Sequence, residues 1–169
     1  MSYQFFFSHT PENYPQSPAM QKIKPWIYSN WWPSVYTNNG FQYSCVEQEM
    51  MHRKALLFGD NETAKQIMSQ TQPAVMKNLG RKVHSFNEEK WDKYKYEIVY
   101  DACREKFRQN PELKKALLAT KGILVEVSPY DRVWGIGFAF FNAMKNVNHW
   151  GENLLGKALT QVREELRSE

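Results

Sequence analysis

The sequence predicts an α+β fold that is mainly helical, a single compact domain in which helices surround a few short strands. Two long segments, Val46–Phe58 and Glu88–Gln109, are rich in helix-forming residues and lack internal glycine and proline. Ile123–Val127 is a short apolar run bounded by turn signals, as in a buried strand. At 169 residues the chain is long enough for one domain, 1–169, with a real core.

The first third of the chain contains the remaining strand signals. Tyr3–Ser8 is short and aromatic, which indicates a strand. Thr10–Pro25 holds four of the eight prolines and is expected to be an ordered loop. Val35–Thr37 and Phe41–Tyr43 flank an Asn-Gly pair, which predicts a β-hairpin.

The rest of the chain reads mostly as helix. Ser44 offers an N-cap for Val46–Phe58, and Glu47 stands three residues later in capping-box spacing. Gly80 is expected to end a helix, so that Arg81 can turn toward a site. The other predicted helices are Asn61–Ser69, Pro73–Leu79, Glu88–Gln109, Pro111–Ala119 and Glu152–Leu166.

Two apolar helix stripes and one long loop complete the expected organisation. The long helix shows a partly regular stripe of Trp91, Tyr94, Ile98, Ala102 and Phe107, and the last helix one of Leu155, Leu159, Val162 and Leu166. Ser128–Trp150 is expected to be a long loop, and loops of this length are often functional.

Composition limits the classes of function. The net charge of +4 suits an anionic ligand such as a phosphate, or weak attraction to nucleic acid, but equally a merely basic protein. Cys45 and Cys103 lack zinc-site or disulfide spacing, and the four histidines lack metal-ligand spacing. There is no P-loop and no dinucleotide-binding glycine motif. No metal and no cofactor are therefore expected.

The chain shows no targeting or membrane signal. Met1–Phe7 is too short for a signal peptide, and no apolar run reaches transmembrane length. The expected location is the cytoplasm, or the nucleus by diffusion.

The candidate catalytic groups are two carboxylates and one amine. Glu47 and Lys54 are seven residues apart and share a helix face with Met50 and Met51, although a cap and an exposed lysine would give the same pattern. Asp131 follows a strand and precedes Trp134 and Gly135, so it could bond a ribose hydroxyl, act as an acid or base, or simply form a turn.

The candidate binding groups are aromatic, basic and amide side chains. Trp31, Trp91 and Trp134 could hold a flat base, or could be core residues. Arg81 and Lys54 could contact a phosphate, although Arg81 could equally lie on the surface. Asn153 opens the last helix, where free N–H groups would form an anion site.

Six segments in this order resemble the NADAR (YbiA-like) family. They are Ser29–Pro33, Ser44–Asp60, Leu79–Arg81, Trp91–Asp92, Asp131–Gly137 and Gly151–Lys157. The resemblance implies a compact, mainly helical fold that cleaves N-glycosidic bonds. It matches the family's site motifs at Asn30, Glu47, Lys54, Gly80, Arg81, Trp91, Asp131, Trp134 and Asn153.

The same resemblance suggests roles and substrates. Glu47 would be the general acid/base, Asp131 would orient the ribose or share the acid/base task, and Lys54 could attack a ring-opened ribose. Family members remove ADP-ribose from guanine in nucleic acid, or act on a ribosylamino-pyrimidine intermediate of riboflavin synthesis. The expected partner is thus ADP-ribose or ADP-ribosylated nucleic acid, with no membrane and with the oligomeric state open.

One departure separates these alternatives. YbiA-like members often carry Glu-His where this chain has Glu47-Gln48. An amide cannot move a proton near neutral pH, which weakens the riboflavin hypothesis more than the ADP-ribose one. A non-catalytic ADP-ribose reader and an interaction scaffold with core tryptophans also remain open.

Overall fold

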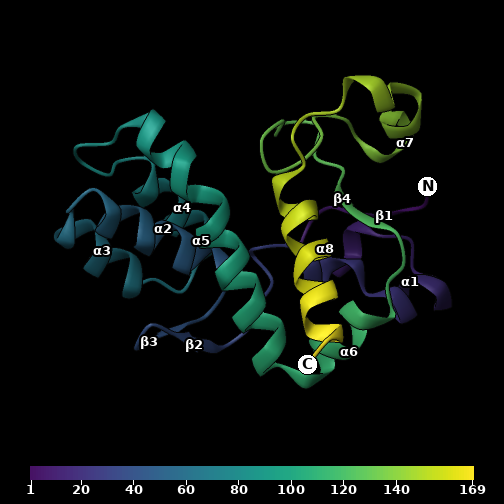
Figure 1. Cartoon of the computed structure of the whole chain (residues 1–169), viewed down its shortest axis with the longest axis horizontal. Helices are drawn as coiled ribbons and strands as arrows, with labels where there is room; N and C mark the ends of the chain where they lie inside the picture. Colours follow the sequence, from purple (N-terminus) through teal and green to yellow (C-terminus); the bar gives the residue numbers. More distant parts are fainter. The chain divides into compact units, whose positions relative to one another are not determined.

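A computed structural model describes all residues, Met1–Glu169, and the chain packs as two compact units. Unit 1 consists of Met1–Ser29 together with Pro111–Glu169, and unit 2 is Asn30–Asn110. Figure 1 labels the elements of both units. None of the helices combines the length and apolarity needed to cross a bilayer. The expectation of a single domain stays a prediction.

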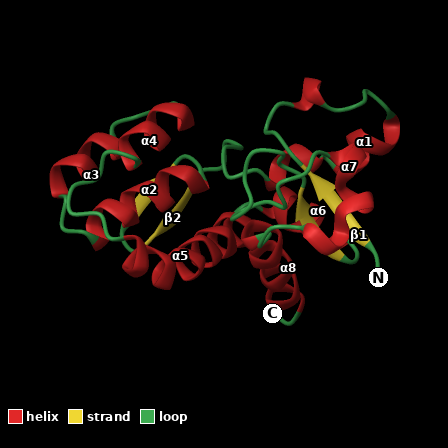
Figure 2. Ribbon diagram, turned by 90° about the horizontal axis from the view of Figure 1, so that it is seen from above, coloured by secondary structure: helices red, strands yellow, loops and turns green.

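Unit 1 is built on two paired strands and one long helix (Figure 2). β1 (Tyr3–Phe6) pairs with β4 (Ile123–Glu126) in parallel, with Tyr3 opposite Ile123. α8 (Leu154–Arg167) packs on β4, and its predicted stripe is buried. The remaining elements are η1 (Pro11–Asn13), α1 (Pro18–Ile23), η2 (Pro25–Tyr28), α6 (Pro111–Ala119), α7 (Phe140–Ala143) and η3 (Met144–His149).

Two segments expected to be loops contain helical turns. Within Thr10–Pro25, Pro18 takes the first helical position of α1 and the Ser17 hydroxyl accepts from the Met20 N–H, a combination that starts a helix. Ser128–Trp150 contains α7 and η3, and the Trp150 indole N–H donates to the Ala143 carbonyl at 2.8 Å, which links the two ends of η3.

The start of α8 also differs from the expected anion site. α8 begins at Leu154, and Asn153 before it has a left-handed backbone with φ of 51°. Five consecutive backbone N–H groups before and at the start of α8 donate to carbonyls of residues 132–136. The pairs are Gly151 to Ile136, Glu152 to Arg132, Asn153 to Gly135, Leu154 to Val133, and Leu155 to Trp134. These donors are occupied, so the prediction of free N–H groups for an anion is wrong.

Unit 2 is a hairpin followed by four helices. Its elements are β2 (Tyr36–Asn38), β3 (Phe41–Tyr43), α2 (Val46–Leu57), α3 (Asn61–Met68), α4 (Pro73–Gly80) and α5 (Glu88–Gln109). Asn39 and Gly40 have φ of 51° and 83°, which confirms the predicted hairpin turn. α2 packs against α3, α4 and α5. The α5 stripe is buried except for Tyr94, which is exposed.

The predicted capping box at the start of α2 is wrong. The N-cap is Cys45, one residue later than expected, and its side chain makes no cap hydrogen bond. Instead, Gln48 Oε1 accepts from the backbone N–H and the hydroxyl of Ser44, at 2.8 and 3.1 Å. Because Gln48 takes this role, the Glu47 side chain is free to serve another.

The side chain of Asn153 is predicted to stabilise unit 1. Its Oδ1 accepts from the Glu126 N–H and its Nδ2 donates to the Leu124 carbonyl, both at 3.0 Å. Asn153→Gly keeps the left-handed backbone but leaves both β4 groups unpaired, so unfolding free energy should fall by about 2–4 kcal/mol.

Chemical denaturation of both variants checks this expectation. Asn39→Gly is the matched control, because Asn39 has the same φ of 51° but an exposed side chain. Equal stability of the two variants would show that the Asn153 amide does not hold β4.

Candidate functional site

The candidate site is centred on Glu47, which lies in the first turn of α2 and is 7% exposed. The Glu47 backbone N–H donates to the Asn30 carbonyl at 3.0 Å, which fixes Asn30 and Trp31 beside the helix start. The Trp31 side chain, whose only donor is its indole N–H, hydrogen-bonds the Glu47 carboxylate. Glu47 is thus held within unit 2 through its backbone by Asn30 and through its carboxylate by Trp31.

The electrostatics of Glu47 suit proton transfer near neutral pH. Burial raises the pKa of Glu47 to about 7, because an ionised carboxylate loses its hydration there. The charge of Lys77, the Trp31 hydrogen bond and the charges of Lys54 and Arg81 act in the opposite direction, in that order of size. The net result is a carboxyl group that both gains and loses a proton at physiological pH.

Two of these cations lie at the C-terminal end of α4, Lys77 in its last turn and Arg81 at its C-cap. Lys77 and Arg81 are four residues apart, so they lie near one face of that helix, and both are exposed. Gly80 makes this approach possible: a Cβ on Gly80 would lie 1.9 Å from Met51 Sδ on α2. The predicted importance of Gly80 therefore has a packing cause, the contact of α4 with α2.

The Lys54 side chain lies close to two aromatic rings. Its Nζ lies 4.6 Å from the ring centroid of Phe86 and 5.5 Å from that of Trp91. Burial lowers the pKa of Lys54, the Glu47 charge raises it, and the Arg81 charge lowers it further. A lysine with a lowered pKa is more often neutral and hence more nucleophilic.

One polar atom at the site lacks a partner. Asn30 Oδ1 is buried and accepts no hydrogen bond. Buried acceptors without partners are rare in folded proteins and cost free energy. A ligand hydroxyl or N–H would satisfy this oxygen.

Together these groups can carry out a defined kind of chemistry. Glu47 supplies an acid/base, Lys54, Lys77 and Arg81 attract an anion, and the rings of Trp31 and Trp91 can contact a flat or apolar group. Sequence reasoning placed Glu47, Lys54, Asn30, Trp31, Gly80, Arg81 and Trp91 at a site, and the structure brings all of them together in unit 2.

The other predicted site residues belong to unit 1. Asp131 Oδ1 accepts from the backbone N–H groups of Val133 and Trp134, each at 2.8 Å, which closes a tight turn. A Cβ on Gly135 would lie 2.8 Å from the Glu126 carbonyl, so this glycine lets the turn pack on β4. Ligand contacts by Asp131, Trp134, Gly135 and Asn153 stay predictions, and the Asn153 amide is already bonded to β4.

Comparison with known proteins identifies the family. The NADAR domain model matches residues 6–167, nearly the whole chain. The chain belongs to the NADAR domain family. The family match and the fold agree, because the resemblance implied a compact, mainly helical α+β fold of this kind.

Relatives and a solved structure support this assignment. N-glycosidase R617 of Acanthamoeba polyphaga mimivirus is 46% identical over 148 residues, covering 82% of this chain and 86% of the relative. Protein irg-1 of Caenorhabditis elegans is 38% identical over 83% of this chain and 75% of its own length. The NMR structure of E. coli YbiA superposes with a TM-score of 0.75 at 25% identity, covering 99% of this chain and 86% of that one.

Within this NADAR domain, Gln48 has a structural task. Its Nε2 donates to the carbonyls of Ile67 and Met68, at 3.2 and 3.4 Å, while its Oε1 accepts from Ser44. The residue ties α2 to the end of α3. Its amide character therefore says little about which substrate the site accepts.

Lys77 is the site residue that sequence reasoning missed. A signal was present, because Lys77 stands one turn before Arg81 on the same helix. Only the packing of α4 on α2 brings the charge of Lys77 near Glu47.

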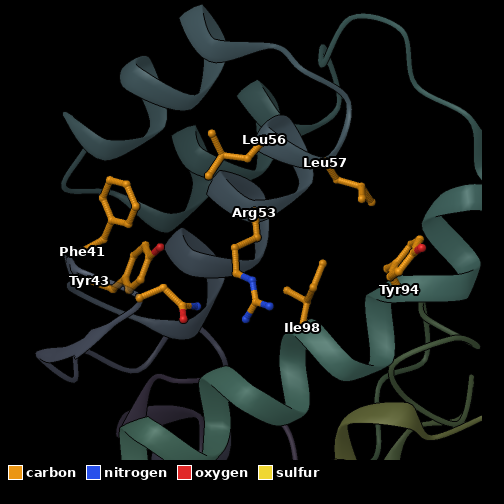
Figure 3. Close-up of a pocket in the computed structure, with 8 residues that line it drawn as sticks. Phe41, Tyr43, Arg53, Leu56, Leu57, Tyr94 and Ile98 are labelled. Atoms are coloured by element: carbon orange, nitrogen blue, oxygen red, sulfur yellow. The ribbon is translucent and has the colours of Figure 1, made fainter.

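A separate hollow of about 340 Å³ lies on unit 2 between α2, α5 and β3 (Figure 3). Figure 3 shows Arg53 pointing into it. Arg53 is already paired with Glu49 and Asp101, at 3.2 and 2.8 Å, and the other lining residues are mostly apolar or aromatic. The hollow therefore lacks an available acid/base group, and the Glu47 cluster is the better candidate.

Burial of Glu47 predicts a pH dependence of stability. The folded-state pKa of about 7 lies above the ordinary value of 4.5, so the protein loses stability as pH rises from about 4.5 to above 7. The loss attributable to Glu47 should be about 3 kcal/mol. Thermal unfolding of Glu47→Gln should show no such contribution. The stability of the variant relative to the native protein should therefore increase as the pH rises across this window. Parallel stability curves for the two proteins would contradict the burial of an ionisable Glu47.

Proposed function

We propose that this protein is an N-glycosidic bond hydrolase that removes ADP-ribose from guanine bases of nucleic acid. The observation that carries the proposal is the buried Glu47, whose pKa of about 7 lets it act as acid and base. The relatives R617 and YbiA are both named N-glycosidases, which supports glycosidase chemistry in general. The cations around Glu47 support a ligand with a diphosphate such as ADP-ribose, and the choice of guanine rests on the family resemblance alone.

In the proposed reaction, Glu47 donates its proton to the departing base nitrogen. The bond between the ribose C1′ and that nitrogen breaks, and the bonding electrons leave with the base. Positive charge develops on the ribosyl carbon, as in other glycoside hydrolyses. Water then adds to C1′ and returns one proton to Glu47, which restores the starting state.

Binding and chemistry would be divided among the surrounding residues. Arg81 and Lys77 would hold the diphosphate, and Trp31 and Trp91 would contact the base or the sugar. Asn30 Oδ1 would accept from a ligand hydroxyl or N–H.

Lys54 has two roles open to it. It could stabilise the phosphates as a point charge. It could also attack C1′ of the ring-opened substrate, where C1′ is joined to the base nitrogen as an imine. The base then leaves as its amine and C1′ forms a Schiff base with Lys54, which water hydrolyses to release the aldehyde form of ADP-ribose and the free lysine. Burial lowers the pKa of Lys54, which favours the second role.

A second candidate substrate is a ribosylamino-pyrimidine intermediate of riboflavin synthesis. The riboflavin biosynthesis protein PYRR of Arabidopsis thaliana is 40% identical over 80 residues, which is 47% of this chain and 12% of that protein. The match is partial, so it supports this candidate less than the cation cluster supports a diphosphate. A non-catalytic ADP-ribose reader is disfavoured, because a reader needs no buried carboxyl group that titrates near pH 7.

Glu47→Gln should abolish most turnover while the fold persists. The change removes the transferable proton but keeps the side-chain shape, so the rate should fall by about 10²–10⁴. The assay is release of ADP-ribose from guanine-ADP-ribosylated DNA, with ADP-ribosylated protein and the riboflavin intermediate as alternative substrates. Glu62→Gln on exposed α3 is the matched control and should retain activity. Near-native activity of Glu47→Gln would rule out its role.

Lys54→Arg separates the two roles of Lys54. Arginine keeps the charge but is too basic to form a Schiff base, so a nucleophilic Lys54 predicts retained binding and lost turnover. Borohydride should then trap a covalent adduct on the native protein and on Lys90→Ala, whose lysine also stacks on an aromatic ring, but not on Lys54→Ala. An active Lys54→Arg without any trapped adduct would leave Lys54 as a phosphate contact.

A further inference from the structure

Lys77 is an exposed lysine close to the indole ring that bonds the buried Glu47 carboxylate. Its side chain is exposed, and its Nζ lies 6.0 Å from the ring centroid of Trp31. The same indole hydrogen-bonds Glu47 through its N–H. Among the charges that act on Glu47, that of Lys77 is the strongest. Lys77 is therefore both the main electrostatic partner of Glu47 and an exposed cation that a ligand can reach.

A phosphate group would meet two such cations on one helix face. Arg81 lies four residues after Lys77, is also exposed, and also stabilises the Glu47 carboxylate. Both side chains could swing toward a bound phosphate, because neither is packed in the core. Gly80 keeps this turn of α4 against α2, so the phosphate would lie close to Glu47.

We propose that Lys77 couples the arrival of the substrate's diphosphate to the protonation of Glu47. This inference rests on the proposed function. In the free protein Lys77 supports the ionised carboxylate. A bound phosphate competes for the charge of Lys77, and Glu47, still buried, then takes up one proton from solvent. That proton is the one transferred to the departing base nitrogen.

The coupling would select for substrates that carry a phosphate. A ligand without a phosphate does not compete for the charge of Lys77, so the carboxyl group of Glu47 stays partly ionised and is a poor acid. If phosphate binding makes the stabilisation of the ionised form tenfold weaker, the protonated fraction of Glu47 at about pH 7.5 rises from about a quarter to about three quarters. Binding would then take up about half a proton per ligand.

Calorimetric titration of the full chain with ADP-ribose measures this uptake directly. The titration is run at pH 7.5 in two buffers of different ionisation enthalpy. The phosphates of ADP-ribose do not titrate near neutral pH, so the proton count reports on the protein. We expect about half a proton taken up by the native protein and none by Glu47→Gln.

Variants of α4 and its flank test the part played by Lys77. Lys77→Gln should bind ADP-ribose with most of the proton uptake lost, and Lys77→Arg should restore the uptake. Lys82→Gln is the matched control, because it removes the same charge from an exposed neighbouring position. It should behave as the native protein.

The outcomes separate this inference from the proposed function. Binding without proton uptake, or equal uptake by Lys77→Gln and the native protein, overturns the coupling alone. Proton uptake as expected, in a protein that releases no ADP-ribose from any substrate, supports the coupling and overturns the proposed reaction. Failure of the native protein to bind ADP-ribose overturns both.

Discussion

The burial of one carboxyl group, that of Glu47 in the first turn of α2, is the constraint on which the site depends. Burial alone would keep this group protonated, and the surrounding cations alone would keep it ionised. Lys77, Lys54, Arg81 and the Trp31 N–H offset burial only in part, which leaves a pKa of about 7. The balance between the two effects makes Glu47 a usable acid and base at the same pH.

That balance requires close packing elsewhere in unit 2. α4 can bring its cations to Glu47 only because Gly80 has no side chain to collide with Met51. The start of α2 can leave Glu47 uncommitted only because Gln48 takes over the bonds to Ser44. A buried ionisable group costs stability, and such costs are typical of sites that perform chemistry.

The sequence predicted elements well where local signals act alone. The bounds of α5 (Glu88–Gln109) and α6 (Pro111–Ala119) follow from their caps and prolines and were correct. Predictions failed where side chains competed for backbone groups. Gln48 displaced the expected Ser44 cap, and the carbonyls of 132–136 took the N–H groups expected to bind an anion.

The part of the site that lies on α2 could be predicted from the sequence. Glu47 and Lys54 share a face by helical spacing, whereas the place of Lys77 depends on how α4 packs on α2. The most direct test of this electrostatic arrangement is a carbon-13 NMR titration of the Glu47 carboxyl carbon, assigned with Glu47→Gln. A midpoint near pH 7 is the predicted result. A midpoint near the ordinary value of 4.5 would show that Glu47 is solvated and ionised, and would contradict its role as the acid.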